Sequence, residues 1–178
     1  MKFKLLLLLF SLIVLSCSNN DEPVIEVKAE ITLNKEYEVE FNLDGISLIS
    51  ERFDYEEDLD LNDDEILNIK ELDIKEIEIT FNNFSGDSGG FDLEVKFGKD
   101  FDNLPFEVDY KIEDIKNFIS TNRKISLSSY LDINELSQMF FDEQVLYFLG
   151  VVETIDILPI PSKMLVKLKI VLDAEITD

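Results

Sequence analysis

The chain has 178 residues, a length that suits a single domain, and its 16 Lys and Arg residues are outnumbered by 39 Asp and Glu residues, for a net charge of −23. It contains no His and no Trp. The absence of His excludes Ser-His-Asp and Cys-His nucleophile systems and HExxH zinc sites. The acidic balance argues against a nucleic-acid partner, because binding to phosphates depends on Lys and Arg.

The first 16 residues have the pattern of a secretory signal: Lys2 and Lys4 precede an apolar stretch at 5–15, and the small residue Ser16 follows. The apolar stretch is too short for a membrane-spanning helix, which needs roughly 20 residues, so permanent anchoring by this segment is the weaker alternative. The residues Val14-Leu15-Ser16-Cys17 resemble a lipobox, the site of bacterial lipoprotein maturation. This resemblance implies cleavage between Ser16 and Cys17 and a diacylglycerol on the Cys17 thiol.

Residues 17–23 follow as a short polar and acidic segment that we interpret as a flexible tether. It is similar to the acidic patch after the cysteine in Bacteroidota lipoproteins that are sent to the cell surface. We therefore expect an outer-membrane anchor and display on the cell surface. Loss of Lys2 and Lys4 with the signal leaves 14 cations against 39 carboxylates, a charge of −25 on the mature chain.

Residues 24–178 are expected to form one domain made mainly of strands, because apolar and polar residues alternate along them. The first two alternating runs, 24–33 and 37–41, are separated by Asn34-Lys35, which predicts a tight hairpin. Two further runs, 77–81 and 91–97, are separated by a glycine-rich segment at 85–90. This pair is predicted to form a second hairpin.

The oxygen-bearing residues Asp60, Asn62, Asp64, Asn68 and Glu71 have the spacing of an EF-hand calcium loop. Glu65 occupies the sixth position, where such a loop needs glycine for a sharp turn. The residues that follow also alternate like a strand instead of forming an exiting helix. We therefore expect no cofactor and no metal, with calcium at these five residues as the open alternative.

The second half of the chain predicts strands at 106–110, 125–127, 145–157 and 166–176, the last two joined at 159–162 as a long hairpin. A capping box starts at Asp132 and predicts a helix, and a weaker helical pattern starts at Glu113. The expected fold is all-β, an antiparallel β-sandwich with one or two short helices, and a partly closed barrel is the alternative.

No catalytic constellation stands out in the sequence. Paired carboxylates could hydrolyse glycosidic bonds, but so many acidic residues always provide pairs, and Trp platforms for sugars are absent. The aromatic pairs Phe140-Phe141 and Tyr147-Phe148 could form an exposed binding patch, and we expect them in the core instead. We therefore expect a protein that is not an enzyme, with a carboxylate-only glycan hydrolase as the alternative.

Two stretches carry a resemblance to a family. Residues 77–86 form a predicted strand that ends in the turn Phe84-Ser85-Gly86, and residues 135–150 form a predicted helix that leads into a strand. With these stretches, region 24–178 resembles small Bacteroidota lipoproteins of unknown function. The resemblance implies a sandwich in the cell envelope and supplies no catalytic residues. The expected function is a lipid-anchored, non-enzymatic binding or accessory module, whose partner is an envelope protein or a glycan; calcium-dependent adhesion is a further alternative.

Overall fold

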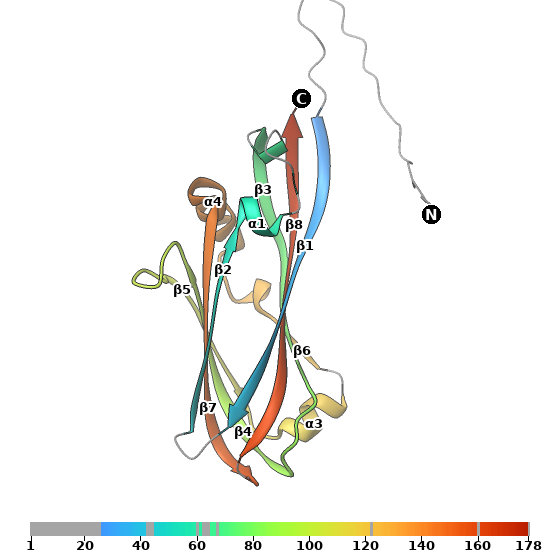
Figure 1. The fold of residues 1–178 in the computed structure, drawn as a ribbon, viewed down its shortest axis with the longest axis vertical. Coiled ribbons are helices and arrows are strands. Elements are labelled where there is room, and N and C mark those ends of the chain that lie inside the picture. Colours follow the sequence, from blue (N-terminus) through green and yellow to red (C-terminus); the bar gives the residue numbers. More distant parts are fainter. Residues whose placement is uncertain are drawn as a thin grey trace, which may run out of the picture.

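Two four-stranded antiparallel sheets pack face to face in the computed structural model, which describes residues 26–41, 45–59, 61, 65–66, 68–121, 123–159 and 161–177 (Figure 1). The first, called the β1 sheet, contains in spatial order β1 (Glu26–Phe41), β8 (Ser162–Thr177), β3 (Ile69–Asn82) and β6 (Lys124–Ser126). The second, called the β2 sheet, contains β2 (Ile46–Asp54), β7 (Val145–Leu158), β4 (Ser88–Gly98) and β5 (Phe106–Ile112). The predicted all-β antiparallel sandwich is confirmed.

Strands that follow each other in the chain mostly belong to different sheets. Of the described strands, β4 and β5 alone are both consecutive and paired. Eight strands that alternate between two sheets in this order form a jelly roll. This arrangement makes most contacts non-local, because β1 pairs with β8 along its whole length.

Three predicted hairpins are wrong. Asn34 and Lys35 lie inside β1, where they pair with Lys169 and Leu168, because β8 is as long as β1 and keeps both residues extended. The segment after β3 crosses to the other sheet instead of folding back beside it, and the same holds between β7 and β8. A turn signal marks the end of a strand, but it does not decide whether the next strand joins the same sheet.

The sequence patterns did not predict β2 or the short helix α1 (Tyr55–Asp58) that follows it. Ile46, Leu48, Ile49 and Phe53 place apolar residues in both phases of the alternation, so the strand signal is broken. In the structure, Ile49 and Phe53 point into the core, while Ile46 and Leu48 point outward.

The helices begin where aspartates cap them. The Asp132 carboxylate accepts a hydrogen bond from the Glu135 N–H (3.1 Å) at the start of α4 (Ile133–Glu143), which confirms the predicted cap. Asp114 caps α3 (Ile115–Ser120) in the same way. A single 3-10 turn, η1 (Leu127–Ser129), lies between β6 and α4.

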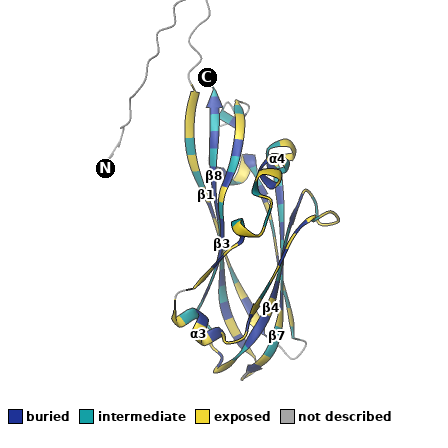
Figure 2. Ribbon diagram, turned by 180° about the vertical axis from the view of Figure 1, so that it is seen from behind, coloured by how far each residue is buried: buried dark blue, intermediate teal, exposed yellow. Residues whose placement is uncertain are grey.

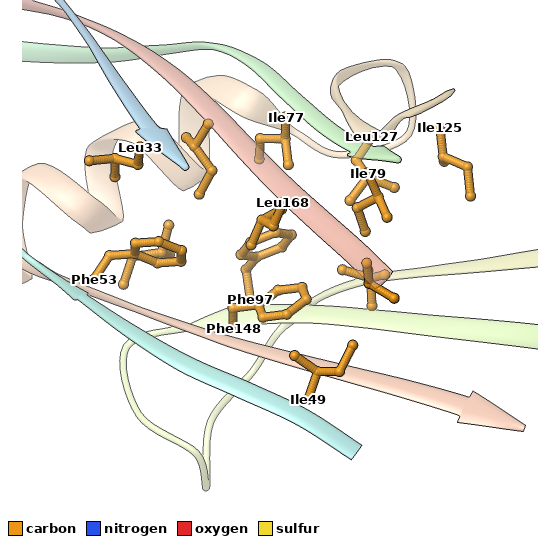
Figure 3. Packing of buried hydrophobic residues seen from close by; sticks show 14 of the residues in the cluster. Leu33, Ile49, Phe53, Ile77, Ile79, Phe97, Ile125, Leu127, Phe148 and Leu168 are labelled. Atoms are coloured by element: carbon orange, nitrogen blue, oxygen red, sulfur yellow. The ribbon is translucent and has the colours of Figure 1, made fainter. Parts of the chain in front are cut away.

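The core lies between the two sheets, and burial alternates along the strands (Figure 2). Leu33, Ile77, Ile79 and Leu168 of the β1 sheet face the inward side chains of the β2 sheet (Figure 3). The rings of Phe97 and Phe148 contribute from that second sheet, with 5.4 Å between their centroids. The inner faces are therefore fully used for packing, and exposed polar or charged side chains that could bind a ligand lie on the outer faces and at the ends of the sandwich.

The free edge of β3 is covered by serine hydroxyls. The Ile74 N–H donates to Ser137 Oγ of α4 (2.8 Å), and the Ile77 N–H donates to Ser128 Oγ of η1 (2.9 Å). These bonds satisfy donors that would otherwise attract another strand.

The turn after β3 is packed by an aromatic ring. The Phe84 ring covers Gly86 so closely that a Cβ at position 86 would lie 2.3 Å from the ring.

Candidate functional site

The outer face of the β1 sheet carries ion pairs between neighbouring strands. Lys163 Nζ of β8 lies 2.6 Å from Glu38 Oε1 of β1, and Lys169 Nζ of β8 lies 3.0 Å from Glu76 Oε2 of β3. The hydrogen bond from Lys169 holds the pKa of Glu76 below its ordinary value. Further pairs on this face are Lys28–Glu175, Lys167–Glu36, Lys75–Asp173 and Lys124–Glu76. The lysines of this face are therefore engaged with its own carboxylates.

One carboxylate of this face is buried. Glu78 on β3 is only 7% exposed, and its Oε1 pairs with the Lys124 ammonium of β6. The hydrogen bond to Glu78 raises the pKa of Lys124. Because a buried charge is costly without a partner, this pair holds the short strand β6 against β3.

The outer face of the β2 sheet changes in character from one edge to the other. Strand register places Leu48, Val151, Glu94 and Asp109 side by side across β2, β7, β4 and β5. The next row is Ile46, Glu153, Asp92 and Lys111. Ile46 and Leu48 are 58% and 69% exposed. The face thus runs from exposed aliphatic side chains at the β2 edge to carboxylates at β4 and β5.

A hollow of about 420 Å³ lies on the acidic half of this face. Its lining includes the carboxylates of Asp92, Glu94, Asp109 and Glu153 together with one cation, Lys111. Val151 also lines it and connects it to Leu48 on the neighbouring strand. We call the six residues Ile46, Leu48, Val151, Asp92, Glu94 and Glu153 the docking face.

A lysine neutralises part of the carboxylate cluster beside this hollow. Carboxylate oxygens of Glu94, Glu107 and Asp109 lie within 4.8 Å of one another, close enough to share a cation. Lys96 Nζ lies 2.9 Å from Glu94 Oε1 and 3.4 Å from Glu107 Oε2. The hydrogen bond from Lys96 lowers the pKa of Glu94. A general acid for glycoside hydrolysis needs a raised pKa, so this environment acts in the opposite direction.

A second polar cluster connects the β1 and β2 edges of the two sheets. Lys35 Nζ of β1 lies 2.9 Å from Asp58 Oδ1 of α1 and 3.7 Å from Glu51 Oε1 of β2. The Tyr37 hydroxyl donates to Glu51 (3.2 Å), and burial raises the pKa of Tyr37 above its ordinary value. These bonds connect the two sheets, and the tyrosine stays protonated, so the cluster has a structural role.

The sequence-predicted site residues are only partly within the described structure. Ser16, Cys17 and the tether 17–23 lie outside the described residues, as do Asp60, Asn62 and Asp64 of the calcium motif. Asn68 is described, and its carbonyl accepts a hydrogen bond from the Thr177 N–H (3.1 Å). Glu71 is exposed on β3, which already begins at Ile69. The calcium hypothesis stays a prediction.

The aromatic pairs divide between the core and the surface. Phe140 and Phe148 are fully buried, while Tyr147 lies on the outer face of β7 and meets Phe101 edge to face, with 4.8 Å between ring centroids. Phe101 is 50% exposed. Sequence reasoning missed Ile46, Leu48 and Phe101, and the broken alternation in β2 was the signal that could have indicated the first two.

Comparisons with known proteins do not assign a function. No protein-family model matches the chain, and no curated protein matches it in sequence. The solved structure of a decameric BFDV capsid protein is similar in shape, with a TM-score of 0.43 and 12% sequence identity over 83% of this chain and 99% of that chain. A likeness at this level carries no argument about function. In the part of the chain that the structure describes, no helix is long and apolar enough to cross a membrane.

Proposed function

We propose that this protein is a lipid-anchored, non-enzymatic binding module of the bacterial outer envelope, and that its docking face binds a partner protein. One observation carries the proposal: Ile46 and Leu48, both more than half exposed, lie in register beside a hollow lined by four carboxylates. Exposed apolar residues grouped with polar ones mark interaction surfaces. Among the described residues, the ion-paired outer face of the β1 sheet has no such combination.

The chemistry of the docking face defines the kind of partner. Leu48 and Val151 would bury aliphatic side chains, while Asp92 and Glu153 would attract Lys or Arg. The net charge of −25 expected for the mature chain would steer a basic partner and repel anionic lipid and nucleic acid. We therefore infer a partner protein whose contact surface combines aliphatic and cationic residues.

The position of the docking face suits a module that is anchored at its N-terminus. β1 begins at one end of the sandwich, and β2 begins at the opposite end, next to the end of β1 (Figure 1). A lipid on Cys17 would attach the chain through the segment that leads to Glu26. Ile46, at the start of β2, would then lie at the end of the sandwich away from the membrane.

The anchor and the docking face need separate tests. For the anchor, Cys17→Ala should move the full chain from the membrane fraction to the soluble fraction and abolish labelling with a radioactive fatty acid. Unchanged membrane retention with unchanged labelling would reject the anchor without any bearing on the docking face.

For the docking face, a photoreactive amino acid is placed at position 48 and, as the control, at the exposed position 32 on the outer face of β1. We expect position 48 to cross-link to one basic envelope protein in cells and position 32 to give no comparable adduct. Glu153→Lys should reduce the yield at least about fivefold, and Glu38→Lys on the opposite face should not. Equal yields at both positions, or an adduct with a second copy of the chain, would reject the proposed partner.

A further inference from the structure

Two cationic side chains differ from all the others in the described residues. Each of the other described Lys and Arg side chains forms an ion pair with a carboxylate. Lys111 and Arg123 form none, and both line the same cavity of about 380 Å³ beside α3. In a chain with this excess of carboxylates, an unpaired cation is the exception. Two of them at one cavity indicate a site for an anion that the protein itself does not supply.

The cavity has a defined framework. Lys111 comes from the end of β5, and the Arg123 N–H donates to the Phe118 carbonyl (3.3 Å), which ties the backbone before β6 to the end of α3. The carboxylate of Asp114, which also lines the cavity, already accepts a hydrogen bond from the Asn117 N–H (2.9 Å). One acidic neighbour of the two cations is thus already engaged in capping the helix.

The remaining lining side chains limit the kind of anion. Tyr110 and Phe118 contribute aromatic surface, while the Asn117 amide and the Glu113 carboxylate offer hydrogen bonds to hydroxyl groups. The volume is within the range of small-molecule sites, roughly 300–1,000 Å³. Lys and Arg together would bind a carboxylate by charge-assisted hydrogen bonds. We propose that this cavity, called the α3 pocket, binds a small organic anion that carries both a carboxylate and hydroxyl groups, with an acidic monosaccharide as the simplest example.

This proposal goes beyond docking of a partner protein, because its site is built around α3 and Arg123. The docking face is carried by β2, β7 and β4, and Lys111 lies at the border, where it lines both the α3 pocket and the hollow of the docking face. The overall negative charge does not prevent anion binding, since at physiological ionic strength charges are screened beyond about 8 Å. The groups nearest to the cavity therefore determine whether an anion binds there. Among the described residues, no carboxylate forms an ion pair with Lys111 or Arg123.

The test is calorimetry on the full chain in detergent, with glucuronate as the probe and glucose as the neutral control. Glucuronate should bind at least about tenfold more tightly than glucose, and Lys111→Gln and Arg123→Gln should each weaken it about tenfold. Lys116→Gln is the matched control, because Lys116 is on α3 but already pairs with Asp87 at 3.3 Å. It should change the affinity by less than about twofold.

Three results would overturn the proposal. Glucuronate that fails to bind at about 10 mM would remove the site. Equal weakening by Lys116→Gln would show a general charge effect instead of a pocket. Inorganic phosphate that competes as well as glucuronate would show an anion site without recognition of a hydroxylated carboxylate. Urea midpoints that match the unsubstituted protein show that the variants fold. An unchanged cross-link from position 48 in Arg123→Gln, whose residue does not line the hollow of the docking face, separates failure of this site from failure of the docking face.

Discussion

The outer faces of the two sheets have the same kind of backbone and opposite surface chemistry. On the β1 sheet, lysines of β8 reach carboxylates on both neighbouring strands, such as Glu38 on β1 and Glu76 on β3. On the β2 sheet, the central strand β7 presents Leu149 and Val151 outward, and β2 presents Ile46 and Leu48. One face therefore satisfies its own charges. The other pairs Glu94 and Glu107 with Lys96 but leaves aliphatic surface and the carboxylates of Asp92 and Glu153 available.

Under the proposed function, this difference assigns stability to one face and partner binding to the other. Cross-strand ion pairs stabilise a sheet modestly and keep its surface polar, which also discourages association with other chains. Exposed aliphatic residues beside carboxylates give no comparable benefit to the isolated domain. If this division holds, substitutions on the β1 sheet should change the free energy of unfolding, and substitutions on the docking face should not.

The largest expected change on the outer faces comes from Lys124→Met. Methionine keeps much of the side-chain volume but leaves the Glu78 carboxylate buried without its cation. We expect the free energy of unfolding to fall more than for any other ion pair of this face, because the loss of one partner leaves a buried charge uncompensated. Urea unfolding followed by circular dichroism measures the change.

Lys28→Met provides the reference for that experiment. Lys28 pairs with Glu175 at 3.4 Å, but its side chain is largely exposed, so the loss should be less than about 0.5 kcal/mol. Equal losses in the two variants would mean that the burial of Glu78 has no special weight and that the face is a uniform set of weak pairs.

A smaller and pH-dependent effect is expected for Glu76→Gln. The hydrogen bond from Lys169 lowers the pKa of Glu76 in the folded state, so the charged carboxylate stabilises the fold at pH values above its unfolded pKa of about 4.5. This contribution is lost as the pH falls through the lower, folded pKa. The variant should therefore be less stable than the unsubstituted protein at pH 7, by a few tenths of a kcal/mol for an exposed pair, and the difference should shrink as the pH falls below 4.5.

Glu30→Gln controls for the removal of one negative charge. Glu30 is exposed on β1 and forms no ion pair in the described structure. Its substitution should leave stability at pH 7 unchanged or raise it slightly, because it reduces repulsion among carboxylates. A stability difference for Glu76→Gln that did not shrink as the pH was lowered below 4.5 would contradict the assigned cause.

Local sequence patterns predicted where the strands and helices lie better than they predicted which strands pair. The alternation in 145–157 and 166–176 correctly indicated β7 and β8, and Asp132 correctly marked the start of α4. Which sheet each strand joins depends on contacts far apart in the chain, such as those between β1 and β8, and no local signal encodes them. The hairpin predictions failed for this reason.

The docking face was missed for a related reason. Its rows, such as Leu48, Val151, Glu94 and Asp109, exist only once four strands are in register. In the sequence, Ile46 and Leu48 interrupt the alternation that would have revealed β2. The residues that obscured the strand are the same ones that expose apolar surface, so a broken pattern in an otherwise regular β protein is itself informative.

The smallest expected effect on stability concerns Leu48→Thr. Because Leu48 is 69% exposed and threonine suits a strand, the free energy of unfolding should change by less than about 0.5 kcal/mol. The same substitution at the neighbouring Ile49, which is 5% exposed and faces the core, should cost about 2–4 kcal/mol, because it removes buried apolar surface and buries a hydroxyl. Urea unfolding of the two variants compares adjacent positions of one strand. A loss for Leu48→Thr that approaches the loss for Ile49→Thr would mean that Leu48 packs against the domain itself, and the outer face of the β2 sheet would then serve stability as the β1 sheet does.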